Sequence, residues 1–133
     1  MKKNIWAIIA ARSGSKSIRD KNIKLLNKKP LIAYTIISAI KSRVFKKILV
    51  LTDSIKYAKI AKKYGAEIPF IRPKEISQDL STDNELYQFL IKFLDKKRIA
   101  PPDFFAHLSP VVPIRLNNVI KRGVEYFFRK KKL

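Results

Sequence analysis

The stretch Ile5-Trp6-Ala7-Ile8-Ile9-Ala10-Ala11-Arg12-Ser13-Gly14 changes within a few residues from apolar to polar and basic. Its continuous apolar part, from Ile5 to Ala10, is typical of a strand that is buried on both faces of a parallel sheet. The polar segment continues to Lys29 and predicts a long loop at the carboxyl end of this strand. The stretch therefore predicts the first strand of an α/β fold with functional residues directly after it.

The rest of the chain alternates between helical and strand patterns. Apolar residues at helical spacing predict helices at 31–40, 55–64, 83–93 and 117–128, and apolar runs predict strands at 48–51, 68–71 and 104–108. Pro30 suits the first helix position, Thr82 with Glu85 forms a capping box, and Gly65 ends the second helix. This order predicts a mainly parallel sheet with helices on both faces, whose ligands bind beyond the carboxyl ends of the strands.

Composition limits the class of protein. The chain has 133 residues, 47% of them hydrophobic, and no cysteine, which fits one domain with a real core and excludes a disulfide framework. Its first apolar run is too short for a membrane span or a signal-peptide core, so we expect a cytoplasmic protein without a membrane partner.

The net charge of +20 at pH 7 attracts polyanions such as nucleotides or nucleic acid. Lysine carries most of this charge, whereas nucleic-acid readers favour arginine. Two interpretations remain: a compositional bias spread over exposed faces, with a functional subset in one loop, or a small basic nucleic-acid-binding protein. The second explains the run Arg129 to Lys132 but not the alternation of strands and helices.

The loop after the first strand places four cations around Gly14, namely Arg12, Lys16, Arg19 and Lys21. Small residues let backbone N–H groups approach an anion, and cations neutralise it, so a triphosphate is the ligand that we expect. The spacing is neither a Walker A motif nor a dinucleotide fingerprint, because the loop contains a single glycine. A solvated basic surface loop is the alternative.

The pattern Arg-x-Gly-Ser-Lys-x-Ile-x-x-Lys-Asn in residues 12–22 resembles the signature of the acylneuraminate cytidylyltransferase (CMP-sialic acid synthetase) family. The similarity continues in register through 29–36, 52–54 and 63–73. Residues 109–115 are a divergent form of the family's Pro-Thr-Ser-Pro-Leu-Arg segment. The resemblance implies a Rossmann-like fold of the nucleotide-diphospho-sugar transferase type. It also implies transfer of CMP from CTP to a nine-carbon sugar acid, with release of pyrophosphate, for surface polysaccharide, lipopolysaccharide or glycoconjugate synthesis.

The resemblance also implies roles for individual residues. Lys21 becomes the main transition-state cation, while Arg12 and Lys16 hold the β- and γ-phosphates. The implied nucleotide-binding residues are Ala11, Arg12, Gly14, Ser15, Lys16, Lys21, Asn22, Arg72, Ser81 and Thr82. The implied sugar-binding residues are Ser109, Pro110, Val111 and Arg115.

Several residues have competing interpretations. Thr82 can cap a helix as well as contact the cytidine. Asp53 is interpreted as a helix cap in preference to a residue that orients the first loop or binds metal. His107 and Trp6 are expected in the core. Val111, with Val112, replaces polar residues of the family's sugar-facing segment, which indicates a less hydroxylated acceptor unless both valines only pack under the loop.

The resemblance implies Mg²⁺ and a homodimer, and the family's metal carboxylates and dimerisation segment are expected beyond residue 133. Residues 1–133 are therefore interpreted as the N-terminal nucleotide-binding part of a single cytidylyltransferase domain. We expect this incomplete part not to catalyse the reaction at a normal rate by itself, and no metal ligand is assigned within it. A non-catalytic fragment or a decayed remnant is the alternative.

Overall fold

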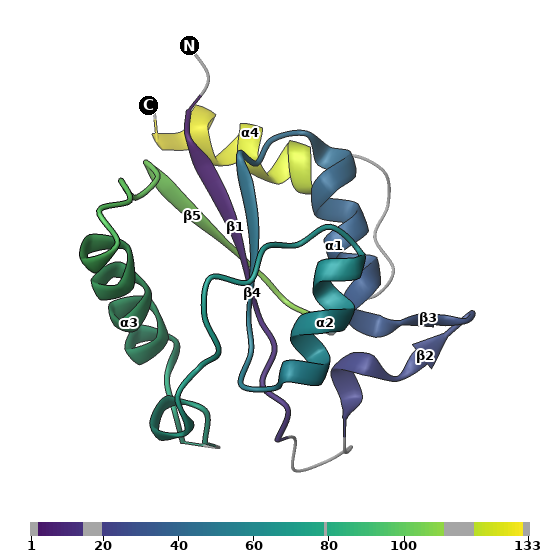
Figure 1. The fold of residues 1–133 in the computed structure, drawn as a ribbon. Coiled ribbons are helices and arrows are strands. Elements are labelled where there is room, and N and C mark those ends of the chain that lie inside the picture. Colours follow the sequence, from purple (N-terminus) through teal and green to yellow (C-terminus); the bar gives the residue numbers. More distant parts are fainter. Residues whose placement is uncertain (1–2, 15–19, 79, 111–118, 132–133) are drawn as a thin grey trace.

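The structure, a computed structural model, describes residues 3–14, 20–78, 80–110 and 119–131 (Figure 1). Within these ranges no helix is long and apolar enough to cross a membrane. The elements in chain order are β1 (Ile5–Ala10), η1 (Lys21–Ile23), β2 (Leu25–Leu26), β3 (Lys29–Pro30), α1 (Leu31–Ser42), β4 (Lys47–Leu51), α2 (Ile55–Lys63), η2 (Lys74–Ile76), α3 (Asp83–Lys96), β5 (Phe104–Leu108) and α4 (Val119–Lys131).

A parallel sheet of order β4-β1-β5 forms the centre of the molecule (Figure 1). In its register, Ile8 lies between Leu49 of β4 and His107 of β5. All three strands run in the same direction, so their carboxyl ends meet at one edge of the sheet. The mainly parallel α/β fold expected from the sequence is confirmed.

The alternation of side chains along the strands divides the core into two layers. On one face Ile9 and Val50 pack with Ile32 of α1 and Tyr57 of α2. On the other face Trp6, Ile8, Leu49 and Leu51 pack with three leucines of α3, namely Leu86, Leu90 and Leu94. Helices therefore cover both faces, as expected, and Trp6 is a core residue.

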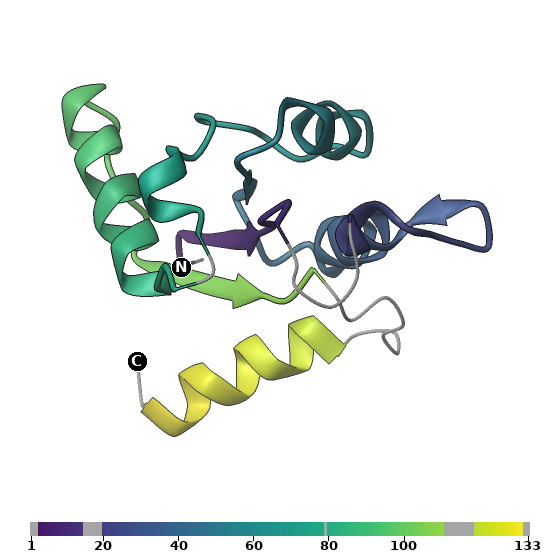
Figure 2. The ribbon, with the colours of Figure 1, turned by 90° about the horizontal axis from the view of Figure 1, so that it is seen from below.

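Helix α4 lies along β5, on the face opposite to α3 (Figure 2). The ring of Phe104 contacts the rings of Phe127 and Phe128 at centroid distances of 5.7 Å and 5.2 Å. The next residue, Phe105, points to the other face and contacts Trp6. This alternation explains why one strand can hold a helix on each side.

Three local expectations are corrected by the structure. The strand expected at 68–71 is reduced to two isolated parallel bridges, Leu49 with Glu67 and Thr52 with Ile71. The loop expected from Ala11 to Lys29 contains η1 and a two-stranded hairpin, β2–β3, and Pro30 precedes α1 as its N-cap.

Helix α2 turns Tyr57, Ala58 and Ala61 toward the core. Ile55 is 64% exposed, whereas Tyr57 is 1% exposed. Gly65 follows α2 with φ +107°, and a Cβ at this position would lie 2.9 Å from Ile40 Cδ1. This close approach explains why glycine ends the helix.

Candidate functional site

The candidate site lies at the carboxyl edge of the sheet, where three loops leave β1, β4 and β5. The amide of Ala11 donates to the carbonyl oxygen of Leu51 at 2.9 Å and extends the pairing of β1 with β4 by one residue. Thr52 is fully buried beside it. The first loop and the Thr52-Asp53-Ser54 segment therefore start side by side.

Asp53 holds the start of the first loop. Its Oδ1 accepts from the Ser13 amide at 2.8 Å, and its Oδ2 accepts from Ser13 Oγ at 2.8 Å. The helix cap of α2 is the next residue, Ser54, whose Oγ accepts from the Tyr57 amide at 3.2 Å. The interpretation of Asp53 as a cap is therefore wrong, and the alternative, orientation of the first loop, is confirmed.

A second residue holds the first loop, at Asp20. This residue is Tyr57, in the first turn of α2. Tyr57 donates its hydroxyl hydrogen to Asp20 Oδ1 at 2.8 Å. Burial of the phenol, followed by the hydrogen bond and charge of Asp20 and the charge of Asp53, raises the pKa of Tyr57. Tyr57 and Asp20 were not predicted as site residues, because neither residue stands out in the sequence by type or spacing.

Asn22 closes the loop upon itself. Its Nδ2 donates to the carbonyl oxygen of Arg12 at 3.1 Å, which joins the two ends of the segment 12–22. The side chain is buried, and its Oδ1 has no partner among the described residues. A buried acceptor without a partner is costly, so this oxygen is available to a donor on a ligand.

Arg72 brings a second cation to the same edge. Its backbone amide donates to the carbonyl of Thr52 at 2.8 Å, and its Nη2 donates to the carbonyl of Ile76 at 2.6 Å. The residue is 7% exposed, and Nε has no partner among the described residues.

The charges around Arg72 act in opposite directions. Burial lowers the pKa of Arg72, the charge of Asp53 opposes that shift, and the charge of Arg12 adds to it. The charges of Arg12 and Asp53 therefore act on Arg72 with opposite sign. An anionic ligand at this place would relieve the repulsion between the two cations.

Ser81 and Thr82 stand at the start of α3. Thr82 Oγ1 accepts from the Glu85 amide at 3.1 Å, which confirms the predicted cap. Ser81 Oγ accepts from the Gln78 amide at 2.9 Å. Both hydroxyl oxygens thus serve local turns, and the contact with cytidine stays a prediction for both residues.

The loop after β5 is anchored by α1. Thr35, a fully buried residue of α1, donates its hydroxyl hydrogen to the carbonyl oxygen of Ser109 at 3.0 Å. The sequence offered one signal for Thr35, a hydroxyl within an apolar helix face. Ser109 and Pro110 are half-buried, and their contact with sugar stays a prediction. The predicted site residues that lie outside the described residues are Ser15, Lys16, Val111 and Arg115.

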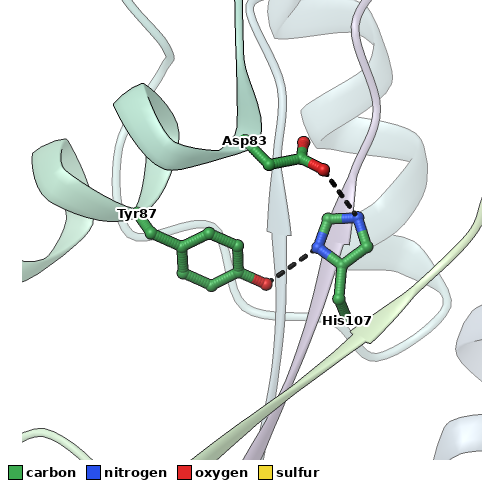
Figure 3. A network of polar contacts seen from close by, with 3 residues as sticks. All are labelled: Asp83, Tyr87 and His107. Carbon is green, nitrogen blue, oxygen red and sulfur yellow. Dashed lines mark hydrogen bonds and ion pairs between the residues drawn. The ribbon is translucent and has the colours of Figure 1, made fainter.

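His107 is not the packed core residue that was expected. Its side chain is 40% exposed, and its Nδ1 shares a hydrogen bond of 2.8 Å with the hydroxyl of Tyr87 (Figure 3). Its Nε2 lies 3.9 Å from Asp83 Oδ2. The reason is that β5 ends the described sheet, so a side chain on this strand reaches solvent beside the first turn of α3.

The Mg²⁺ implied by the resemblance was compared with the donors that are present. In the described ranges, no three His, Cys, Asp or Glu residues gather to hold a metal ion. Both carboxylate oxygens of Asp53, at the sheet edge, accept hydrogen bonds from Ser13. These donors do not fit a metal site, so no catalytic step through Mg²⁺ is derived for this chain.

Known proteins resemble this chain in sequence over most of its length. The chain is 39% identical over 127 residues to an N-acylneuraminate cytidylyltransferase of Escherichia coli, and the match covers 96% of this chain and 29% of that protein. It is 38% identical to the CMP-N,N'-diacetyllegionaminic acid synthase of Legionella pneumophila, with 91% and 52% covered. The chain thus spans about half or less of the length of these relatives.

A solved structure shares the fold. The CMP:2-keto-3-deoxy-manno-octonic acid synthetase, solved in complex with CTP, matches with a TM-score of 0.72 at 16% identity, over 96% of this chain and 48% of that one. The family described as "Cytidylyltransferase" matches residues 6–99, which include β1 except its first residue, the first loop, Asp53, Arg72 and the whole of α3. The chain therefore belongs to the cytidylyltransferase family.

Proposed function

We propose that this chain binds CTP and forms the nucleotide-binding part of an enzyme that transfers CMP to a nine-carbon sugar acid. The observation that carries the proposal is that Arg12, Asn22 and Arg72 all lie where β1 and β4 end, at the carboxyl edge of the sheet. Two cations and a buried free acceptor suit a ligand that is anionic at one end and offers hydrogen-bond donors at the other. CTP has this chemistry in its triphosphate and its cytidine.

The reaction requires charge stabilisation more than acid–base chemistry. A hydroxyl oxygen of the sugar acid attacks the α-phosphorus, and the bond from that phosphorus to the oxygen bridging to the β-phosphate breaks. The hydroxyl proton passes to water, and pyrophosphate leaves with the bonding electron pair. Lys21 is assigned the role of stabilising this developing charge, while Arg12 and Lys16 hold the outer phosphates.

The acceptor is proposed from the names of the relatives. They are described as enzymes of N-acylneuraminate, N,N'-diacetyllegionaminic acid and pseudaminic acid. We infer an acceptor of this class, bound by the loop of Ser109, Pro110, Val111 and Arg115. The hypothesis of a less hydroxylated acceptor, based on Val111 and Val112, is tested by pyrophosphate release with CTP and each sugar acid in turn, in an enzyme completed beyond residue 133.

Titration calorimetry of the chain with CTP and CMP tests nucleotide binding. The outer phosphates of CTP meet the loop cations, so CTP should bind at least about tenfold more tightly than CMP. Lys21→Ala should reduce this ratio. Lys96→Ala is the matched control, because it removes the same charge from the end of α3 and should leave the ratio unchanged. Equal affinities of the wild-type chain for CTP and CMP would contradict the proposed triphosphate site.

A further inference from the structure

The hydroxyl of Tyr57 is a polar group inside an apolar layer. The Tyr57 ring packs with Ile9, Ile36 and Val50, and the residue is 1% exposed. Its hydroxyl reaches out of this layer to Asp20 Oδ1 at 2.8 Å. A phenylalanine would supply the same apolar ring, so the hydrogen bond to Asp20 is what the hydroxyl adds to the packing of the ring.

The partner of this hydroxyl has an unusual backbone conformation. Asp20 adopts φ 54° and ψ 36°, in the left-handed region that aspartate enters more often than most residues other than glycine. It precedes η1, where the Ile23 amide donates to the Asp20 carbonyl at 3.1 Å. Strained backbone persists where surrounding contacts hold it, and Tyr57 supplies such a contact. The direction in which Lys21 and Asn22 leave Asp20 depends on this conformation.

The same short segment of chain also holds the other end of the loop. Asp53 accepts two hydrogen bonds from Ser13, and Tyr57 follows four residues later in the first turn of α2. Residues 53–57, from the end of β4 to the first turn of α2, therefore contact the first loop at Ser13 and again at Asp20. A rigid strand and a capped helix fix the distance between these two contacts.

We propose that Tyr57 is a positioning residue for the nucleotide phosphates: through Asp20, it sets the place of Lys21 and Asn22 at the carboxyl edge of the sheet. The inference rests on the proposed binding of CTP and adds a residue outside the loop to that site. Tyr57 itself touches no phosphate. It restricts the conformations of residues 20–22 before the ligand binds. Binding therefore costs less conformational entropy.

The first test separates the hydroxyl from the ring. Tyr57→Phe should reduce the preference for CTP over CMP by roughly fivefold to tenfold, because the cation Lys21 is less well placed for the outer phosphates. Tyr87→Phe is the matched control, because it deletes the hydroxyl of another hydrogen-bonded tyrosine, on the opposite face of the sheet, and should leave the preference unchanged. An unchanged CTP-to-CMP ratio in Tyr57→Phe would overturn the proposal.

A double-mutant cycle tests whether Tyr57 acts through Asp20. Asp20→Ala removes the carboxylate that accepts the hydrogen bond of Tyr57. Asp20 is half-buried, so this change leaves the Tyr57 ring in the core. If the hydrogen bond carries the effect, the double variant should lose no more of the CTP preference than the more affected single variant. Additive losses would refute the route through Asp20.

Hydrogen exchange without nucleotide keeps this inference separate from the proposed function. The amides of Ile23 and Lys24 bond to the carbonyls of Asp20 and Lys21. Tyr57→Phe should make both amides exchange several-fold faster, while Tyr87→Phe should not. If the wild-type chain showed no preference for CTP, the proposed function would fail. Amide exchange in Tyr57→Phe would then decide by itself whether Tyr57 positions residues 20–22. Unchanged exchange of Ile23 and Lys24 would refute this role of Tyr57.

Discussion

Replacing Asp53 by alanine should destabilise the chain by roughly 3 kcal/mol. The side chain accepts two hydrogen bonds of 2.8 Å from Ser13, one from the amide and one from the hydroxyl. A hydrogen bond to a charged group contributes about 1.5–3 kcal/mol, and the lower value applies here because the site is only partly buried. Two such bonds give the expected loss.

A second consequence concerns Arg72. The charge of Asp53 raises the pKa of Arg72 against the effect of burial. Asp53→Ala leaves the buried guanidinium with less compensation beside Arg12, which adds to the loss of stability. Asp53→Asn keeps an acceptor for one Ser13 bond but removes the charge, and should lie between the wild type and Asp53→Ala.

Urea unfolding, followed by circular dichroism, measures the effect. With a typical dependence of about 1–3 kcal/mol per molar urea, a loss of 3 kcal/mol lowers the midpoint by one molar or more. Asp103→Ala is the matched control, because Asp103 Oδ2 accepts one bond from the Asn4 amide at 3.0 Å in an exposed position. Because this bond is exposed to water, its loss should cost less than about 1 kcal/mol. Equal destabilisation by the two variants would refute the importance of the Asp53–Ser13 pair.

Two further predictions concern α3. Leu90→Ala should cost about 2–5 kcal/mol in the free energy of unfolding, because the side chain is fully buried, whereas Ile91→Ala, at a position 42% exposed, should cost far less; similar costs would contradict the assigned burial. Burial, followed by the charge of Asp83, raises the pKa of Tyr87 from 10.0 to about 12. The neutral phenol therefore stabilises the fold fully below pH 10, and this contribution is lost as the pH rises from about 10 to about 12. Tyr87→Phe should remove that part of the pH dependence, measured by urea unfolding at pH 9 and pH 12.

The regular elements could be predicted because their signals are local. The run from Ile5 to Ala10 is β1, and the run from Phe104 to Leu108 is β5, with the same bounds as the apolar patterns. β1 is buried on both faces and is therefore apolar throughout, so the sequence shows it directly. The loop after β1 was also indicated by its change of composition and by its resemblance to a known family.

The errors arise where the environment of a residue decides its role. Asp53 and Ser54 both suit a helix cap, and the approach of Ser13 from 40 residues earlier selects Ser54 for the cap. Ile55 and Tyr57 both fit an apolar helix face, and the orientation of α2 against the sheet buries Tyr57. A periodic pattern gives the period of a helix but not its rotation relative to a neighbour.

The sequence by itself determined the order of helices α1 to α4 and of the central strands β1, β4 and β5, and the loop that carries the cations, because periodicity and composition are properties of neighbouring residues. Only the tertiary structure decided which residues hold that loop. The contacts of Asp53 with Ser13 and of Tyr57 with Asp20 join residues 40 and 37 positions apart. Such pairs meet because β1 and β4 lie side by side, and no local pattern records which side chains then face each other.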